Sequence, residues 1–154
     1  METEFFDSHA HYNDEKFAED REDVIERIYE SGVTKFVSAG YDVESSIYGL
    51  KLAYEKEYIY TTVGVSPNDV KESIEETEIE IKKIEEILKS EIENKKIVAI
   101  GEIGLDYYWN KENKEIQKYA FIEQIKLANK YNLPIVIHTR EAVMDTLDIL
   151  KNVQ

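Results

Sequence analysis

The sequence predicts an α/β fold built on a parallel sheet. Five short apolar runs rich in β-branched residues alternate with five segments whose apolar residues recur at helical spacing. This alternation is typical of βα units joined by right-handed crossovers. All three histidines lie at the ends of predicted strands, where parallel sheets and barrels carry their chemistry. Two architectures remain open from the pattern alone: a flavodoxin-like five-stranded sheet, and a (β/α)8 barrel of which the chain would supply five of eight units.

The predicted strands are short and are closed by glycine or polar residues. The third is rich in Thr, Tyr and Val, which favour strands. The fifth begins at a proline, whose missing N–H is tolerated at the start of a strand. In chain order the strands pass through Phe5 and Phe6, span 35–39, 58–65 and 96–100, and begin at Pro134.

The predicted helices follow the strands, and most have recognisable ends. Asp20, Asp42 and Asn113 are candidate N-caps, and Gly32 is a candidate helix end. The third helix, 71–93, is a dense mixture of Glu and Lys, which we interpret as a solvated outer face. The fifth follows the last strand.

Length and composition narrow the class of protein. The 154 residues suit one domain, and the absence of cysteine excludes disulfides and fits a reducing cytoplasm. We expect no signal peptide and no membrane span, because no apolar run is long enough. The net charge of −14 argues against duplex binding by a broad basic face. It leaves open a pocket that engages one phosphate through metal ions.

The histidines suggest a metal site. His9 and His11 are two residues apart, so in a strand they point to one face, and Asp7 shares that face. His138 closes the fifth apolar run. A lone His-x-His is also compatible with a surface strand that binds nothing. The placement of all three histidines after apolar runs favours the metal site.

Acidic, basic and amide side chains add to this constellation. Glu102 follows the fourth strand between Gly101 and Gly104, and with the imidazoles it would suit a divalent cation. Asp106 either positions a ligand or a water, or caps its loop. Arg140 either contacts a phosphate or pairs with a surface carboxylate. Two glutamines beside the apolar face of the fourth helix either satisfy backbone groups at a strand end or lie at the surface: Gln117 and Gln124.

Four motifs follow one another over nearly the whole chain. They are Phe6-Asp7-Ser8-His9-Ala10-His11, Gly101-Glu102-Ile103-Gly104-Leu105-Asp106-Tyr107, the stretch from Gln117 to Gln124, and Leu133-Pro134-Ile135-Val136-Ile137-His138-Thr139-Arg140-Glu141-Ala142. In this order and spacing they resemble the TatD family of metal-dependent deoxyribonucleases.

The resemblance implies a partial TIM (β/α)8 barrel, with residues 1–154 as a single domain that supplies the N-terminal five of eight parallel βα units. It implies that His9 and His11 bind one metal ion, that Glu102 is catalytic and bridges two ions, and that His138 binds the second. The implied cofactors are two divalent ions, for which these ligands suit zinc, magnesium or manganese. The implied activity is hydrolysis of phosphodiester bonds in DNA, often from the 3′ end. Related amidohydrolases often bridge their metals with a carboxylated lysine, so Glu102 favours the TatD branch.

The chain departs from the family pattern in two places. Ser66 stands where the family usually has the histidine of a G-x-H-P turn, and Asn68 where a second histidine is common. We therefore expect altered substrate handling, with Ser66, Asp106 and Arg140 as the substrate-binding residues. The family also takes a histidine from a sixth strand and an aspartate from an eighth, and no residue of this sequence can be assigned to either role.

These observations lead to one hypothesis and two alternatives. We expect a TatD-like cytoplasmic hydrolase acting on DNA or small phosphodiesters, incomplete and weakly active or inactive as this chain alone. We also expect the chain to self-associate or to pair with a C-terminal part. The alternatives are a non-catalytic or partner-binding protein that retains the motifs, and a different metal-dependent phosphoesterase.

Overall fold

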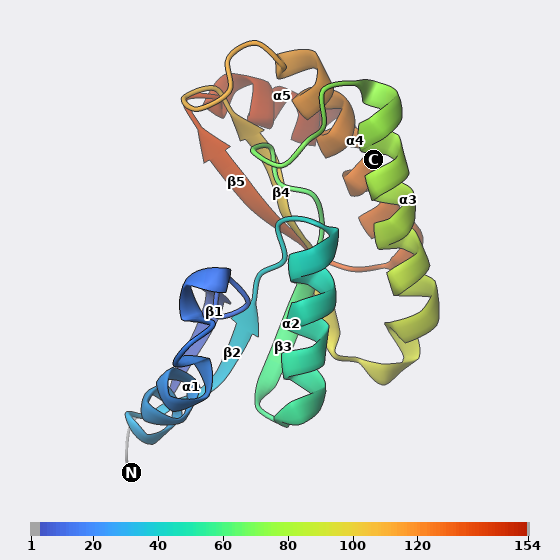
Figure 1. The fold of residues 1–154 in the computed structure, drawn as a ribbon. Coiled ribbons are helices and arrows are strands. Elements are labelled where there is room, and N and C mark those ends of the chain that lie inside the picture. The colour runs from blue at the N-terminus through green and yellow to red at the C-terminus, as the bar shows by residue number, and fades with distance from the viewer. Residues whose placement is uncertain (1–3, 154) are drawn as a thin grey trace.

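The sheet has five parallel strands in sequential order. A computed structural model describes residues 4–153. Neighbouring strands pair in the order β1-β2-β3-β4-β5, whereas a flavodoxin-like sheet would place β2 at the edge beyond β1. The predicted α/β partial barrel is therefore confirmed, and Figure 1 shows the strands curling into an open half-barrel. The strands are β1 (Phe5–Ala10), β2 (Val33–Ser38), β3 (Ile59–Val63), β4 (Ile97–Asp106) and β5 (Ile135–Arg140).

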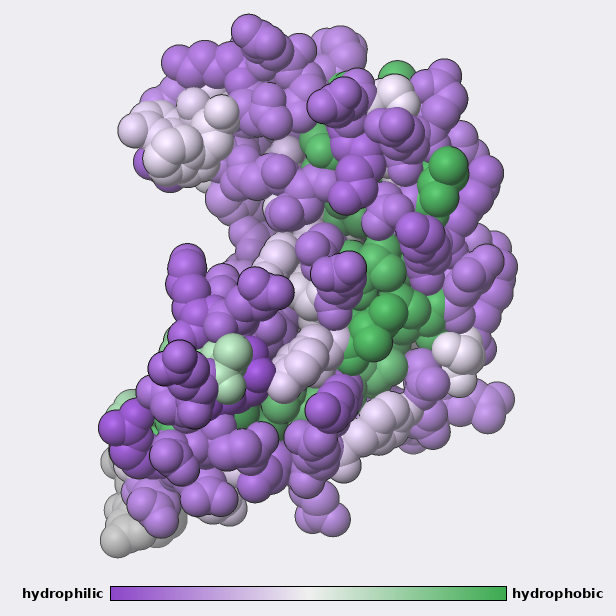
Figure 2. All heavy atoms as spheres, viewed as in Figure 1, coloured by the Kyte–Doolittle hydropathy of each residue, from purple (hydrophilic) through white to green (hydrophobic). Residues whose placement is uncertain are grey.

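Within residues 4–153, five α-helices and two short 3-10 turns connect and flank the strands. Figure 1 shows α2, α3 and α4 along one side of the curled sheet, and Figure 2 shows the opposite side hollowed and largely hydrophilic. No described helix is long and apolar enough to cross a membrane. The elements are η1 (Glu15–Phe17), α1 (Arg21–Glu30), α2 (Val43–Glu55), α3 (Ile74–Glu91), η2 (Ile92–Asn94), α4 (Lys114–Tyr131) and α5 (Val143–Asn152).

The main core lies between the sheet and helices α3 and α4. Ile84 and Leu88 of α3 and Phe121 of α4 are fully buried, and they belong to one cluster with Val63 and Ile100 of the sheet. A smaller cluster packs α1 and α2 against β2 and β3. The charged residues of α3 lie mainly outside these clusters, as the predicted outer face requires.

The predicted helix caps are partly correct. Asp42 forms a full capping box with Ser45 at the start of α2, and Gly32 has a positive φ of 102° just after α1. Asp20 and Asn113 occupy N-cap positions, but neither side chain makes the capping hydrogen bond. The Asn113 side chain instead accepts a hydrogen bond from the Gln117 side chain, which competes for its oxygen.

Strand β4 is longer than predicted. The predicted strand ended at Ile100, before Gly101, yet the strand continues through Glu102 to Asp106. The glycines instead allow β5 to approach closely. A Cβ at Gly101 would come within 2.6 Å of the Val136 Cβ, and a Cβ at Gly104 would overlap the carbonyl oxygen of His138. Gly104 also has a φ of 143°, which favours glycine.

Candidate metal centre

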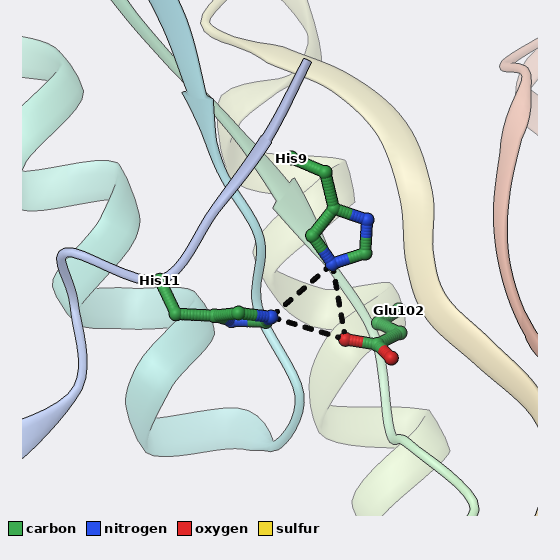
Figure 3. Close-up of side chains that lie close together, drawn as sticks. All are labelled: His9, His11 and Glu102. Carbon is green, nitrogen blue, oxygen red and sulfur yellow. Dashed lines mark hydrogen bonds and ion pairs between the residues drawn. The ribbon is translucent and has the colours of Figure 1, made fainter. Parts of the chain in front are cut away.

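Three ligand-type side chains converge on one point. His9 lies in β1, His11 directly follows it, and Glu102 reaches them from β4 across the curl of the sheet. The Nε2 atoms of the two histidines are 3.2 Å apart, and each lies 3.2–3.3 Å from Glu102 Oε2 (Figure 3). The sequence therefore placed these side chains together correctly. Asp7 lies outside the cluster, and its Oδ1 accepts a hydrogen bond from the His9 backbone N–H.

The spacing of these three atoms fits a divalent cation. Ligand atoms at the corners of a tetrahedron lie about 1.6 bond lengths apart, so bonds of about 2.0–2.1 Å to zinc separate them by roughly 3.3 Å. The observed separations of 3.2–3.3 Å match this value. Nδ1 of His11 lies 3.2 Å from the carbonyl oxygen of Ala39. A proton held there leaves Nε2 free as the ligand atom, the usual arrangement around metal-binding histidines.

His138 approaches the same carboxylate from the other side. Its Nδ1 lies 2.7 Å from Glu102 Oε1, and its Nε2 lies 2.9 Å from Asp106 Oδ2. The two oxygens of Glu102 are thus divided between separate partners, with Oε2 toward His9 and His11 and Oε1 toward His138. A carboxylate that bridges two ions requires this division. His138 is not part of the three-residue cluster, and each of its ring nitrogens faces a carboxylate.

The electrostatics keep the carboxylate ionised. Burial raises the pKa of Glu102, but the hydrogen bonds with His11 and His138 and the nearby His9 outweigh it and hold that pKa well below its usual range. The hydrogen bond with Glu102 raises the pKa of His11 and of His138, against the opposing effect of burial. The result is a negative centre surrounded by imidazoles, suited to a cation.

Asp106 is the last residue of β4. Its side chain is fully buried. Oδ2 faces His138 and accepts a hydrogen bond from the Asn68 side chain, while Oδ1 accepts from the N–H groups of Tyr108 and Trp109. Burial raises the pKa of Asp106, but these bonds prevail and lower it. Asp106 caps the loop and orients His138, and its burial argues against direct contact with a substrate.

Ser66 lines a hollow beside the cluster. The hollow has a volume of ≈ 640 Å³, and His11, Glu102 and His138 also line it. The Ser66 hydroxyl donates to Asp69 Oδ2 at 2.5 Å and accepts from the N–H of Asn68. Ser66 is therefore held in the turn after β3, facing the region where a substrate would approach the cluster.

Arg140 does not form the surface ion pair that was one of its two predicted contacts, and it stacks on aromatic rings instead. Its guanidinium carbon lies 3.8 Å from the centre of the Tyr108 ring and 5.4 Å from that of Trp109. Among residues 4–153 it has no carboxylate partner. Sequence reasoning missed this stack, although the aromatic pair next to Asp106 was a signal that could have indicated it.

The two glutamines of α4 satisfy backbone groups at strand ends. Gln124 accepts from the N–H of Val65 and donates to its carbonyl, and Gln117 does the same with Asp106. Both side chains are fully buried, so the surface alternative is wrong. Through them α4 fixes the chain near Ser66 and the end of β4.

Comparisons with known proteins agree with this architecture. The model of the TatD related DNase family matches residues 6–154. An uncharacterized metal-dependent hydrolase of Bacillus subtilis, YabD, is 42% identical over 146 residues, which are 95% of this chain and 54% of that protein. A protein of Erwinia tasmaniensis called 3'-5' ssDNA/RNA exonuclease TatD is 35% identical over 147 residues, again 95% of this chain and 54% of the relative.

Solved structures give the same result. The crystal structure of YjjV, a TatD homolog from Escherichia coli, superposes with a TM-score of 0.84 at 29% identity and covers 96% of this chain and 55% of that one. A TatD family hydrolase from Entamoeba histolytica gives 0.86 at 25% identity, with 99% and 55% covered. The chain thus spans about half the length of the relatives it matches.

A curled parallel sheet that gathers imidazoles and a carboxylate at one side is typical of barrel-type metal-dependent hydrolases. Since the family model matches almost the whole chain, this protein belongs to the TatD related DNase family.

Proposed function

We propose that this chain forms the part of a hydrolase that holds two divalent ions and cleaves phosphodiester bonds of DNA. The observation that carries the proposal is the division of the Glu102 carboxylate, with Oε2 toward His9 and His11 and Oε1 toward His138. A single ion would need only one of these oxygens. The name of the Erwinia tasmaniensis relative supports the reaction.

Each residue then has a definite task. His9, His11 and Glu102 would hold one ion, and His138 with Glu102 the second, as zinc, magnesium or manganese. When bound, such ions lower the pKa of a water and polarise a phosphoryl oxygen. Asp106 keeps the His138 ring in place.

The substrate side is formed by the hollow and its rim. The Ser66 turn lines the hollow, and Arg140 offers a positive charge beyond His138 on β5. The net charge of −14 disfavours long duplexes, so we propose strand ends or small phosphodiesters as substrates. The lack of cysteine supports action in the reducing cytoplasm.

The test measures metal content and hydrolysis together. Titration calorimetry with Zn²⁺ or Mn²⁺ should give two ions per chain, and Glu102→Gln should weaken both sites. Glu80→Gln is the matched control, because Glu80 has a similarly shielded side chain, 15% exposed against 12%, but pairs only with Lys83. Retention of both ions in Glu102→Gln would contradict the bridging role.

Hydrolysis is measured on 3′-labelled single-stranded DNA, with and without a chelator. We expect the 154-residue chain to be weakly active or inactive alone, and to gain chelator-sensitive activity when the C-terminal half of the Bacillus subtilis relative is added. No activity under either condition, despite two bound ions, would favour the alternative of a metal-binding but non-catalytic protein.

A further inference from the structure

An aromatic cluster, formed by Tyr108 and Trp109, lies on the loop that follows β4. Trp109 is 69% exposed and Tyr108 is 43% exposed, and their rings meet edge to face with centroids 4.8 Å apart. In Figure 1 this loop lies at the upper left, and Figure 2 shows a pale, weakly polar patch there among hydrophilic surface. Such a large exposed indole on an otherwise strongly charged protein suggests a binding surface.

The cluster is held rigidly. The N–H groups of Tyr108 and Trp109 donate to Asp106 Oδ1 at 2.9 and 3.0 Å, and the N–H of Tyr107 donates to the carbonyl oxygen of Arg140. The Arg140 guanidinium covers one face of the Tyr108 ring at 3.8 Å. Trp109 is anchored through its backbone N–H and its edge contact with Tyr108, and most of its ring surface is left open to a ligand.

The cluster is joined directly to the candidate metal centre. Asp106, which holds the two aromatic residues through Oδ1, faces His138 Nε2 through Oδ2 at 2.9 Å. Arg140 follows His138 by two residues on β5, so both side chains project from the same face about 7 Å apart. A strand bound at Trp109 and running past Arg140 would therefore lead toward His138.

We propose that Trp109 stacks a nucleobase of single-stranded nucleic acid, while Arg140 contacts a phosphate of the same strand. This inference rests on the proposed function and names the part of the site that recognises the strand. Stacking suits this protein because the net charge of −14 weakens binding through phosphates alone, whereas a π-face accepts any base without charge. Arg140, fixed by Tyr108, supplies the local positive charge.

The first test uses the tryptophan itself. Trp109 is the single tryptophan of the sequence, so its fluorescence reports on the platform alone. Titration with a thymidine tetranucleotide should quench it, and a tetranucleotide of the same backbone without bases should not. Equal quenching by both strands, or none by either, would overturn the proposal.

The second test is a double-mutant cycle that combines a substitution of Trp109 with removal of the bases from the strand. The dissociation constant of each pair is measured by fluorescence anisotropy with labelled tetranucleotides. Trp109→Ala should weaken binding of the base-containing strand at least about fivefold, and Trp109→Phe should restore most of it. Removing the bases should weaken binding to the wild type but not to Trp109→Ala. If the two losses simply multiply, the indole does not contact a base.

Two further variants complete the design. Tyr29→Ala is the matched control, because Tyr29 is as exposed as Tyr108 but stacks on Tyr58 away from the site, and it should bind as the wild type does. Arg140→Gln should weaken the binding of both strands equally, and the salt dependence of the dissociation constant should fall by about one phosphate contact. A normal salt dependence in Arg140→Gln would exclude the phosphate contact.

These measurements need no hydrolysis, so they separate the two proposals. Base-dependent quenching in a protein that binds metal but never hydrolyses DNA would support the platform and remove the proposed activity. Chelator-sensitive hydrolysis without base-dependent quenching would remove the platform and leave the activity.

Discussion

Gln124 allows the sharpest test of how the fold holds the site. Its side-chain amide accepts from the N–H of Val65 at 2.7 Å and donates to the carbonyl of Val65 at 2.9 Å. Both residues are buried, so Gln124→Ala removes the partners of two backbone groups that water reaches poorly. Each such group costs about 1–3 kcal/mol when unsatisfied. The gain in helix propensity from alanine is only a few tenths of a kcal/mol. We expect a loss of about 2–5 kcal/mol in the free energy of unfolding.

The assay is urea unfolding followed by circular dichroism, with the midpoint and slope fitted for each variant. Lys126→Ala is the control on the same helix, because Lys126 is exposed and its ion pair with Glu123 should contribute below about 1 kcal/mol. If Gln124→Ala lost less than about 1 kcal/mol, as the control should, the backbone of Val65 would not depend on this amide. The account of α4 as the element that fixes the turn before Ser66 would then fail.

Three other predictions follow from the same structure. The hydrogen bond from Tyr107, followed by that from Lys118, lowers the pKa of Asp145. The stability that Asp145 contributes is therefore fully present above its unfolded pKa of about 3.9 and is lost as the pH falls through the lowered pKa of the folded state. Tyr107→Phe should lower the free energy of unfolding by about 1 kcal/mol or less, because Asp145 is partly exposed. This loss should shrink below about pH 4, and a loss that stays constant with pH would exclude the Tyr107–Asp145 pair. Ser66→His, tested with the added C-terminal half, should change kcat/KM on DNA by about tenfold or more and metal affinity by less, because imidazole transfers protons near neutral pH. Equal activity of the two variants across pH would contradict this prediction. Finally, the 154-residue chain should self-associate in light scattering, because Phe5 and Phe6 are exposed on the edge strand β1, and a monomer at all concentrations would refute this.

The sequence predicted the parts of the fold that depend on local or periodic signals. Strand and helix alternation predicted a parallel sheet but left its strand order open, and the resemblance to the TatD family predicted the sequential order of a barrel. The capping box at Asp42 is local. Asp20 shows the limit of such signals, because it stands at the predicted cap position without making the bond. A residue type allows a cap, but the backbone geometry at that position decides whether the side chain reaches the N–H groups.

The candidate site was predictable as far as its residues follow strand ends. His9, His11 and Glu102 converge because the carboxyl sides of parallel strands meet at one rim. The loop-capping hydrogen bonds of Asp106 are local and were one of its two predicted roles. Its contact with His138 and the stack of Arg140 on Tyr108 were not predictable, since they depend on the register of β4 against β5. That register arises between segments more than thirty residues apart, and no local pattern encodes it.

Strand β4 couples the metal cluster to the aromatic platform. Glu102 and Asp106 are four residues apart on one strand, so both project to the same face, and both contact His138. This arrangement requires β5 to lie close enough for a single imidazole to meet both carboxylates, and Gly104 provides the space opposite His138. A side chain at Gly104 would push β5 away and would disturb the ligand geometry and the loop that carries Trp109 together. The glycines around Glu102 are thus best understood as the packing condition for the site, because they let β5 lie close against β4.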